Sequence, residues 1–198
     1  MEKVAVFGVR RVLPLLLVCV IVQGCDRHSV PKPYGYFRIA IPDTAYVQYA
    51  PEGYPYAFAL SANAEVCPHW HEGEHYWIDV VYPGLNATIH CSYKSVHGNL
   101  RTLSRDAQEF LYKHATVASA IPEQGFADPD ARVWGVYYEL LGNTASPIQF
   151  YVTDSTHHFF RGSVYCNAVP NQDSLAPIYD YVREDVRRMM ESFHWQEK

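Results

Sequence analysis

Hydrophobic and polar residues alternate along two neighbouring stretches in the C-terminal part of the chain. Residues 148–153 and residues 159–168 both carry a hydrophobic or small side chain at every second position. This two-residue period is typical of half-buried β-strands. Asp154, Ser155 and Thr156 lie between the two stretches, and their short side chains can accept hydrogen bonds from their own backbone, which favours a turn. The segment therefore predicts a β-hairpin.

The two-residue strand period and the 3.6-residue helical period of hydrophobic side chains predict the remaining elements. Further strands are predicted over residues 37–41, 56–60, 76–82, 87–94 and 133–141. Hydrophobic residues three and four apart predict two α-helices. The first extends from a cap at Asn99 to about residue 117, and the second begins at Asp173 or Ser174, with Pro177 in its first turn. Residues 121–130 contain two prolines and a glycine, and they predict a connecting loop.

The order of these elements predicts the fold class. Few connections between the predicted strands are long enough for a parallel crossover, so most of the sheet is expected to be antiparallel. The predicted class is α+β, with a mostly antiparallel β-sheet of six or seven strands packed by two main α-helices. In outline this arrangement resembles the PsbP-like α-β-α sandwich, a resemblance of fold that implies nothing about function.

The N-terminal residues have the three parts of a secretory signal peptide. Basic residues precede a hydrophobic run over 12–22, which is too short for a transmembrane helix, and a small residue then precedes Cys25. A cysteine after the presumed cleavage site resembles a bacterial lipobox. We therefore expect a lipoprotein signal peptide at 1–24, a lipidated tether at 25–33 with Cys25 as the lipid anchor, and a single globular domain at 34–198. An ordinary signal peptide with an unmodified Cys25 is the alternative.

The charge balance narrows the choice of partners. The chain has 16 basic and 21 acidic residues, of which the signal peptide removes three and one, so 13 and 20 remain and the net charge becomes −7. An acidic domain lacks the basic surface that nucleic acids and anionic membranes require. We therefore expect no nucleic-acid partner, and membrane contact through the N-terminal lipid.

Three cysteines fall in the predicted domain: Cys67, Cys91 and Cys166. In an oxidising compartment this odd number is compatible with one disulfide and one free thiol, and the sequence leaves the pairing open. Cys91 and Cys166 lie in predicted strands, where at least one of them is expected to serve as a small buried hydrophobic side chain.

Residues 71–75 match the H-E-x-x-H pattern of zinc metalloproteases. In that pattern two histidines one helical turn apart, here His71 and His75, bind zinc, and the glutamate, here Glu72, acts as general base. The surroundings favour a polar loop instead, because Gly73 interrupts the segment and a predicted strand follows at once. A looser zinc site needs no helix. Its ligands would be Cys67, His69, His71 and His75.

The tip of the predicted hairpin is the candidate interaction loop, with Asp154, Ser155, His158 and Arg161. These are residue types of a serine hydrolase, but a catalytic triad is assembled from separated elements, and no G-x-S-x-G segment is present. The 16 tyrosines of the chain suit half-buried strands, and an aromatic protein-binding face is the alternative.

Several long segments carry a resemblance to a known family. They are Cys25, PKPYGYFRIAIP at 31–42, ATIHCSYK at 87–94, LYKH at 111–114, GNTASPIQFYVTDSTHHFFRGSVY at 142–165, PNQDSLAPI at 170–178 and ESFHW at 191–195. Together they resemble the gliding-motility lipoprotein GldD family of the Bacteroidetes. The resemblance implies a lipid anchor in the cell envelope, a role in gliding linked to the type IX secretion machinery, no enzymatic activity and no cofactor. The segment at 69–75 is not part of the family pattern, which disfavours a metal site there.

The resulting hypothesis is a non-enzymatic envelope lipoprotein that faces the periplasm and supports motility or secretion through contacts with other envelope proteins. The sequence leaves open whether the inner or the outer membrane holds the anchor. Two alternative functions belong to other classes of protein. One is a zinc-dependent hydrolase using His71, Glu72 and His75, and the other is a small-ligand-binding lipoprotein with a pocket between the sheet and the helices.

Overall fold

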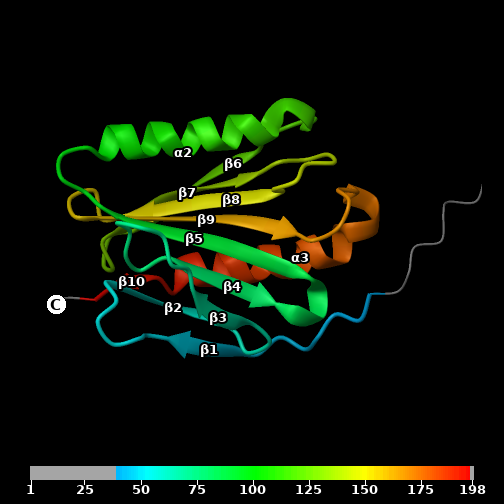
Figure 1. Cartoon of the computed structure of the whole chain (residues 1–198), viewed down its shortest axis with the longest axis horizontal. Coiled ribbons are helices and arrows are strands. Elements are labelled where there is room, and N and C mark those ends of the chain that lie inside the picture. Colours follow the sequence, from blue (N-terminus) through cyan, green and yellow to red (C-terminus); the bar gives the residue numbers. More distant parts are fainter. Residues whose placement is uncertain (1–38, 197–198) are drawn as a thin grey trace, which may run out of the picture. The chain divides into compact units, whose positions relative to one another are not determined.

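The computed structural model describes residues 39–196 (Figure 1). The predicted signal peptide, Cys25 and the tether lie outside the described residues. The described strands are β1 (Tyr46–Tyr49), β2 (Tyr56–Ser61), β3 (Glu65–Pro68), β4 (Ile78–Tyr82), β5 (Ala87–Ser95), β6 (Glu123–Asp128), β7 (Val133–Glu139), β8 (Ile148–Thr153), β9 (His158–Cys166) and β10 (His194–Trp195). The helices are α2 (Leu100–His114) and α3 (Gln172–Glu191), with short 3₁₀ turns at Pro83–Leu85 and Ala115–Val117.

The strands form two antiparallel sheets. Seven of them make the main sheet in the order β3-β4-β5-β9-β8-β7-β6, and β1, β2 and β10 make a small sheet of three. Both predicted hairpins are present, because β4 pairs with β5 along the whole of β4, and β8 pairs with β9 along nearly the whole of β8. The α+β prediction is therefore confirmed, including the mostly antiparallel sheet and the two main helices.

The two helices cover opposite faces of the main sheet (Figure 1). On one face, α3 and the small sheet enclose the largest hydrophobic core, which includes Ile178, Val182, Val186 and Met189 of α3 and Phe193 just after it. The rings of Tyr56, Phe58, Phe160 and Phe193 pack against one another there, with centroids between 4.7 and 6.1 Å apart. On the other face, α2 packs on β7, β8 and β9 through two smaller clusters.

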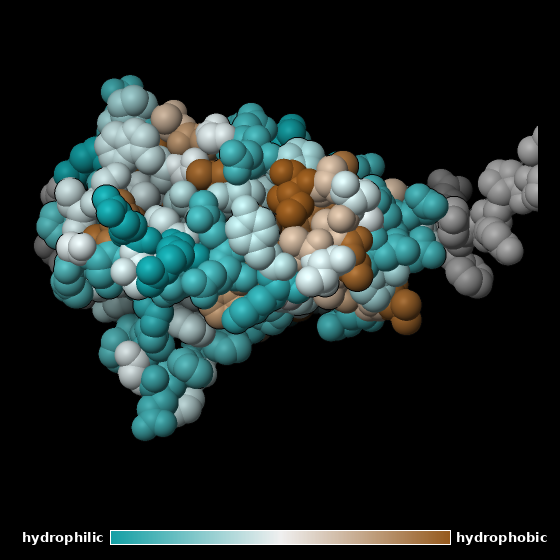
Figure 2. Space-filling model, turned by 90° about the horizontal axis from the view of Figure 1, so that it is seen from above, coloured by the Kyte–Doolittle hydropathy of each residue, from teal (hydrophilic) through white to brown (hydrophobic). Residues whose placement is uncertain are grey.

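Many of the tyrosines serve this packing, as the main interpretation of the composition expected. The buried ones are Tyr56, Tyr82, Tyr93, Tyr137, Tyr138, Tyr179 and Tyr181. Figure 2 shows the α2 side of the molecule as mainly hydrophilic, with hydrophobic side chains in small separate groups. Among residues 39–196, no helix has both the length and the hydrophobic composition needed to cross a membrane.

Two predictions in the N-terminal and central parts of the chain are wrong. Residues 39–41 form no strand, and β1 lies at Tyr46–Tyr49, where Tyr49 packs on Phe58 with ring centroids 5.3 Å apart. The predicted loop at 121–130 contains β6. This edge strand is exposed along most of its length, so it lacks the hydrophobic alternation that identifies a strand, and it is held by backbone pairing with β7.

The helix starts also differ from the predictions. Helix α3 is capped by Asn171, whose Oδ1 accepts a hydrogen bond from the Ser174 amide at 3.1 Å, and Pro177 therefore falls in the second turn. Because Pro177 has no backbone N–H, the Asp173 carbonyl receives no hydrogen bond within the helix. Asp173 is exposed, so this carbonyl can accept a hydrogen bond from water instead. At α2, Asn99 is the cap residue as predicted, but its Oδ1 accepts from the His97 amide and not from the helix.

The three cysteines of the domain are free thiols. Cys91 is buried at 4% exposure in the main core, which confirms the expectation that at least one of them acts as a buried hydrophobic side chain. Burial raises the pKa of the Cys166 thiol to about 11, so this half-buried thiol is held protonated at neutral pH. Cys67 lies exposed on β3.

Candidate functional site

An open cleft lies on the face of the main sheet that α2 covers only in part. Helix α2 packs over β7, β8 and β9, and β3, β4 and β5 extend beyond it (Figure 1). The cleft has a volume of about 280 Å³. Phe110 of α2 forms one wall, and polar side chains of the sheet form the floor, among them His69, Asp79, His90 and Arg161.

Strand pairing explains why these polar residues lie together. Asp79 of β4 stands directly opposite His90 of β5, and His90 stands opposite Ser163 of β9. Directly opposed residues of antiparallel strands point to the same face, with Cβ atoms about 4.5–5.5 Å apart. The alternate residues of these strands, such as Ile78 and Ile89, are buried in the core on the other face. The register thus places a row of polar side chains on the uncovered face.

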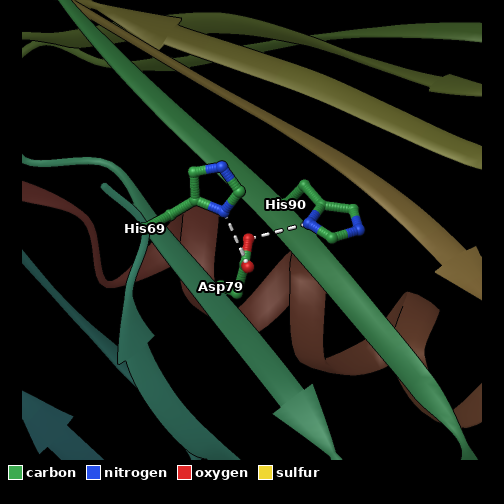
Figure 3. A group of neighbouring side chains, drawn as sticks. All are labelled: His69, Asp79 and His90. Carbon is green, nitrogen blue, oxygen red and sulfur yellow. Dashed lines mark hydrogen bonds and ion pairs between the residues drawn. The ribbon is translucent and has the colours of Figure 1, made fainter. Parts of the chain in front are cut away.

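Asp79 joins two histidines in this row (Figure 3). Its Oδ2 lies 2.9 Å from Nδ1 of His69, and its Oδ1 lies 2.7 Å from Nδ1 of His90. The His69 side chain comes from the segment that follows β3, and its backbone amide donates to the Trp77 carbonyl at 2.9 Å, which continues the pairing between β3 and β4. The two imidazoles are 43% and 49% exposed, and the carboxylate is 22% exposed.

Arg161 is the cation of the cleft. Its Nη2 donates to Ser163 Oγ at 3.1 Å and to Gln149 Oε1 at 3.3 Å, and its guanidinium lies over the Phe110 ring at 4.4 Å. Within residues 39–196, its side chain forms no ion pair with a carboxylate. Burial lowers the pKa of Arg161, because its charged form is partly removed from water. The positive charge of Arg161 on the cleft floor is therefore contacted by neutral hydrogen-bond acceptors and an aromatic ring, and not by a carboxylate.

The predicted zinc ligands are not brought together as a set. Residues 71–74 form a tight turn in which the Glu74 amide donates to the His71 carbonyl at 3.0 Å, and Gly73 has a φ of +76°. The H-E-x-x-H segment therefore lacks the helical geometry that would place His71 and His75 on one face. His71 stacks on Trp77, with ring centroids 5.1 Å apart, and His75 lies beside Tyr76.

Of the predicted zinc set, His69 alone belongs to a group of neighbouring potential ligands in the described part of the chain. Its partners there are Asp79 and His90, with ligand atoms that all lie within 4.8 Å of one another. Asp79 and His90 were not predicted as site residues. The sequence did contain a usable signal, since pairing the 76–82 strand with the 87–94 strand through the Pro83-Gly84 turn places Asp79 opposite His90.

The candidate interaction loop is divided between the two faces of the sheet. Asp154 organises the tip, because its Oδ1 accepts hydrogen bonds from the amides of residues 156, 157 and 158 at 3.0, 2.8 and 2.8 Å. Ser155 is exposed at this tip with a φ of +70°. His158 points to the α3 face, where its Nδ1 lies 2.6 Å from Tyr93 Oη and its ring stacks on Trp195. Arg161 points to the opposite face.

Two further hollows bear on the idea of a ligand pocket. The cavity between the main sheet and α3, lined by Ile148 and Tyr179 among others, measures about 110 Å³, well below the roughly 300–1,000 Å³ usual for small-molecule sites. A larger open groove of about 570 Å³ lies beside the hairpin tip and is lined by Asp154, His158 and Trp195 among others. The cavity between the main sheet and α3 is therefore too small for an ordinary small-molecule ligand, and the groove beside the tip is open to the surface.

Comparison with known proteins gives one family and one fold. A family model described as "Gliding motility lipoprotein GldD" matches residues 26–195. No curated protein matches the chain. The solution structure of cyanobacterial PsbP (CyanoP) from Synechocystis sp. PCC 6803 is similar with a TM-score of 0.50 and 9% sequence identity, over 83% of this chain and 100% of that chain. At this identity the likeness concerns the fold alone, and it agrees with the predicted PsbP-like sandwich.

Proposed function

Since this chain belongs to the family of gliding motility lipoproteins GldD, we propose that a lipid on Cys25 holds it at a membrane of the cell envelope, where it supports gliding through contacts with other envelope proteins. The observation that carries the proposal is the extent of the family match. It covers residues 26–195 and so begins directly after the predicted lipidated cysteine. The domain then faces the periplasm at the end of a short tether.

In this proposal the protein acts without catalysing a reaction and is linked to the type IX secretion machinery. The turn at 71–74 supports the first part, because a metalloprotease needs both histidines of that segment on one helical face. The open groove beside the hairpin tip supports a role in binding. It offers Trp195 and His158 next to a tip whose backbone is fixed by Asp154, and rigid aromatic groups are favoured at protein interfaces.

Gene replacement in the source cells tests the proposal. The chromosomal copy is deleted and replaced by wild type or by Cys25→Ala, and single-cell movement on a surface and protein secretion are recorded together with the protein level. Wild type should restore both activities. Cys25→Ala should be made, remain outside the membrane fraction, and fail to restore movement.

Cys67→Ser is the matched control, because it removes an exposed thiol of the domain and leaves the predicted anchor intact. It should behave as wild type. Full movement with Cys25→Ala would show that lipid anchoring is not part of the function, and full movement after deletion would show that the protein does not support gliding in these cells.

A further inference from the structure

We infer that His69, Asp79 and His90 form a binding site for one divalent transition-metal ion of the zinc class. The observation is the convergence of two imidazoles and one carboxylate from the segment after β3, from β4 and from β5 (Figure 3). The site is distinct from the H-E-x-x-H segment, and it is independent of the proposed role in gliding.

The distances suit a small ion. Zinc binds imidazole nitrogen and carboxylate oxygen at about 2.0–2.2 Å in a tetrahedral arrangement, which places ligand atoms roughly 3.3 Å apart. Both Nδ1 atoms lie within 2.9 Å of an oxygen of the same carboxylate, and the three ligand atoms lie within 4.8 Å of one another. A bound ion requires these atoms to move slightly apart from their hydrogen-bonded positions, and the half-exposed imidazoles leave room for small side-chain rotations.

The backbone supporting these side chains is well fixed. Asp79 and His90 lie within paired strands, and the His69 amide donates a hydrogen bond to the Trp77 carbonyl. Neighbouring rings limit the orientations of both imidazoles, since His69 lies 6.2 Å from Trp77 and His90 lies 5.4 Å from Tyr165 between ring centroids. Ligands carried on rigid strands give a more sharply defined metal site than ligands on loops.

The ligand set selects the class of metal. Two imidazoles with one carboxylate suit zinc and the neighbouring late first-row ions, whereas calcium and magnesium require oxygen ligands. Three protein ligands leave a fourth position open, as in zinc sites that take up an exogenous group. The open cleft provides the room, and Arg161 on its floor makes an anionic group the complementary fourth ligand.

Titration of the purified full-length protein in detergent tests the inference. After treatment with a chelator, the protein is titrated with Zn²⁺ against a chromophoric competitor, and bound zinc is counted by elemental analysis after gel filtration. Co²⁺ substitution adds a visible spectrum that reports the number of ligands. Wild type should bind one ion. His69→Ala, Asp79→Ala and His90→Ala should each weaken binding by at least about 10-fold to 100-fold.

His71→Ala and Cys67→Ser are the matched controls, because they remove nearby potential ligands outside the cluster, and both should leave the affinity unchanged. Thermal unfolding of each metal-free variant verifies that the substitutions leave the fold intact. The inference is overturned if the wild type binds no stoichiometric ion. It is also overturned if His90→Ala binds as tightly as wild type while His71→Ala or Cys67→Ser loses the ion.

Discussion

Replacing Asp185 by asparagine should stabilise the protein at neutral pH. Asp185 lies in α3 with 1% of its surface exposed, and within residues 39–196 it forms no ion pair with a cation. Burial raises the pKa of its carboxyl from 3.8 to about 6, and the nearby Tyr82 and Tyr46 hydroxyls offset only part of this effect. Neither carboxylate oxygen completes a hydrogen bond of ordinary geometry.

The sign and size of the effect follow from proton linkage. Because the pKa is raised in the folded state, the folded protein binds the proton more tightly than the unfolded chain, and stability falls as pH rises from about 4 to about 6. A shift of roughly two units corresponds to at most about 3 kcal/mol at neutral pH. Between pH 5.0 and pH 7.5 the wild type should lose about 1 kcal/mol through this group alone.

Urea unfolding of wild type and Asp185→Asn at pH 5.0 and pH 7.5 measures the effect. The variant should be more stable than the wild type, and its advantage should be about 1 kcal/mol larger at pH 7.5 than at pH 5.0. Glu184→Gln is the control, since this neighbouring carboxylate is exposed and its removal should change stability by less than about 0.5 kcal/mol. The reasoning is refuted if Asp185→Asn is less stable at pH 7.5, or if its difference from wild type is the same at both pH values.

Two further substitutions test the packing and the hairpin tip. Gly135→Ala should destabilise the fold by at least about 1–3 kcal/mol in thermal unfolding, because the new Cβ would lie 2.2 Å from the Tyr151 carbonyl oxygen. Gly125→Ala is the control, since its Cβ would lie in open space, and it should cost under about 1 kcal/mol. Equal effects of the two substitutions would contradict the close approach of β7 and β8 at Gly135. Asp154→Ala should cost about 1.5–3 kcal/mol at pH 7. Burial disfavours the charged form of Asp154, but hydrogen bonds from the amides of residues 157, 158 and 156 outweigh burial and lower the pKa of the carboxyl to about 2. The stabilisation by Asp154 should therefore be lost as pH falls from about 4 to 2. A wild-type protein whose free energy of unfolding does not fall over this pH range would contradict the prediction.

The elements with strong periodicity were predictable because one face of each is buried. The β4–β5 hairpin and helix α3 fall into this group, and their residues alternate between the core and the surface. Strands β8 and β9 keep the same sequence alternation, although both of their faces are largely buried. Strand β6 could not be predicted from hydrophobic periodicity. Its residues are mostly exposed, with Phe126 packed against the core, and the strand is defined mainly by backbone pairing with β7, so no hydrophobic alternation marks it in the sequence.

The candidate site was less predictable because it depends on strand register and not on local spacing. His69, Asp79 and His90 are ten and eleven residues apart, and no short motif links them. The pattern that resembles a known metal motif, from His71 to His75, folds into a turn that separates its histidines. Likewise, adjacency at the hairpin tip placed His158 and Arg161 in one predicted loop, although alternation along β9 directs them to opposite faces.

In-cell photo-crosslinking tests the central claim, which is that the anchored domain acts through contacts with other envelope proteins. A photoreactive residue replaces His157 at the hairpin tip, whose side chain is 78% exposed. Gly84, at the opposite end of β5, is the control position, about 26 Å away along the strand and with open space for a side chain. The account predicts that His157 gives a covalent adduct with an envelope protein required for gliding or type IX secretion and that Gly84 does not. The absence of any adduct from His157, or the same adduct from both positions, would contradict it.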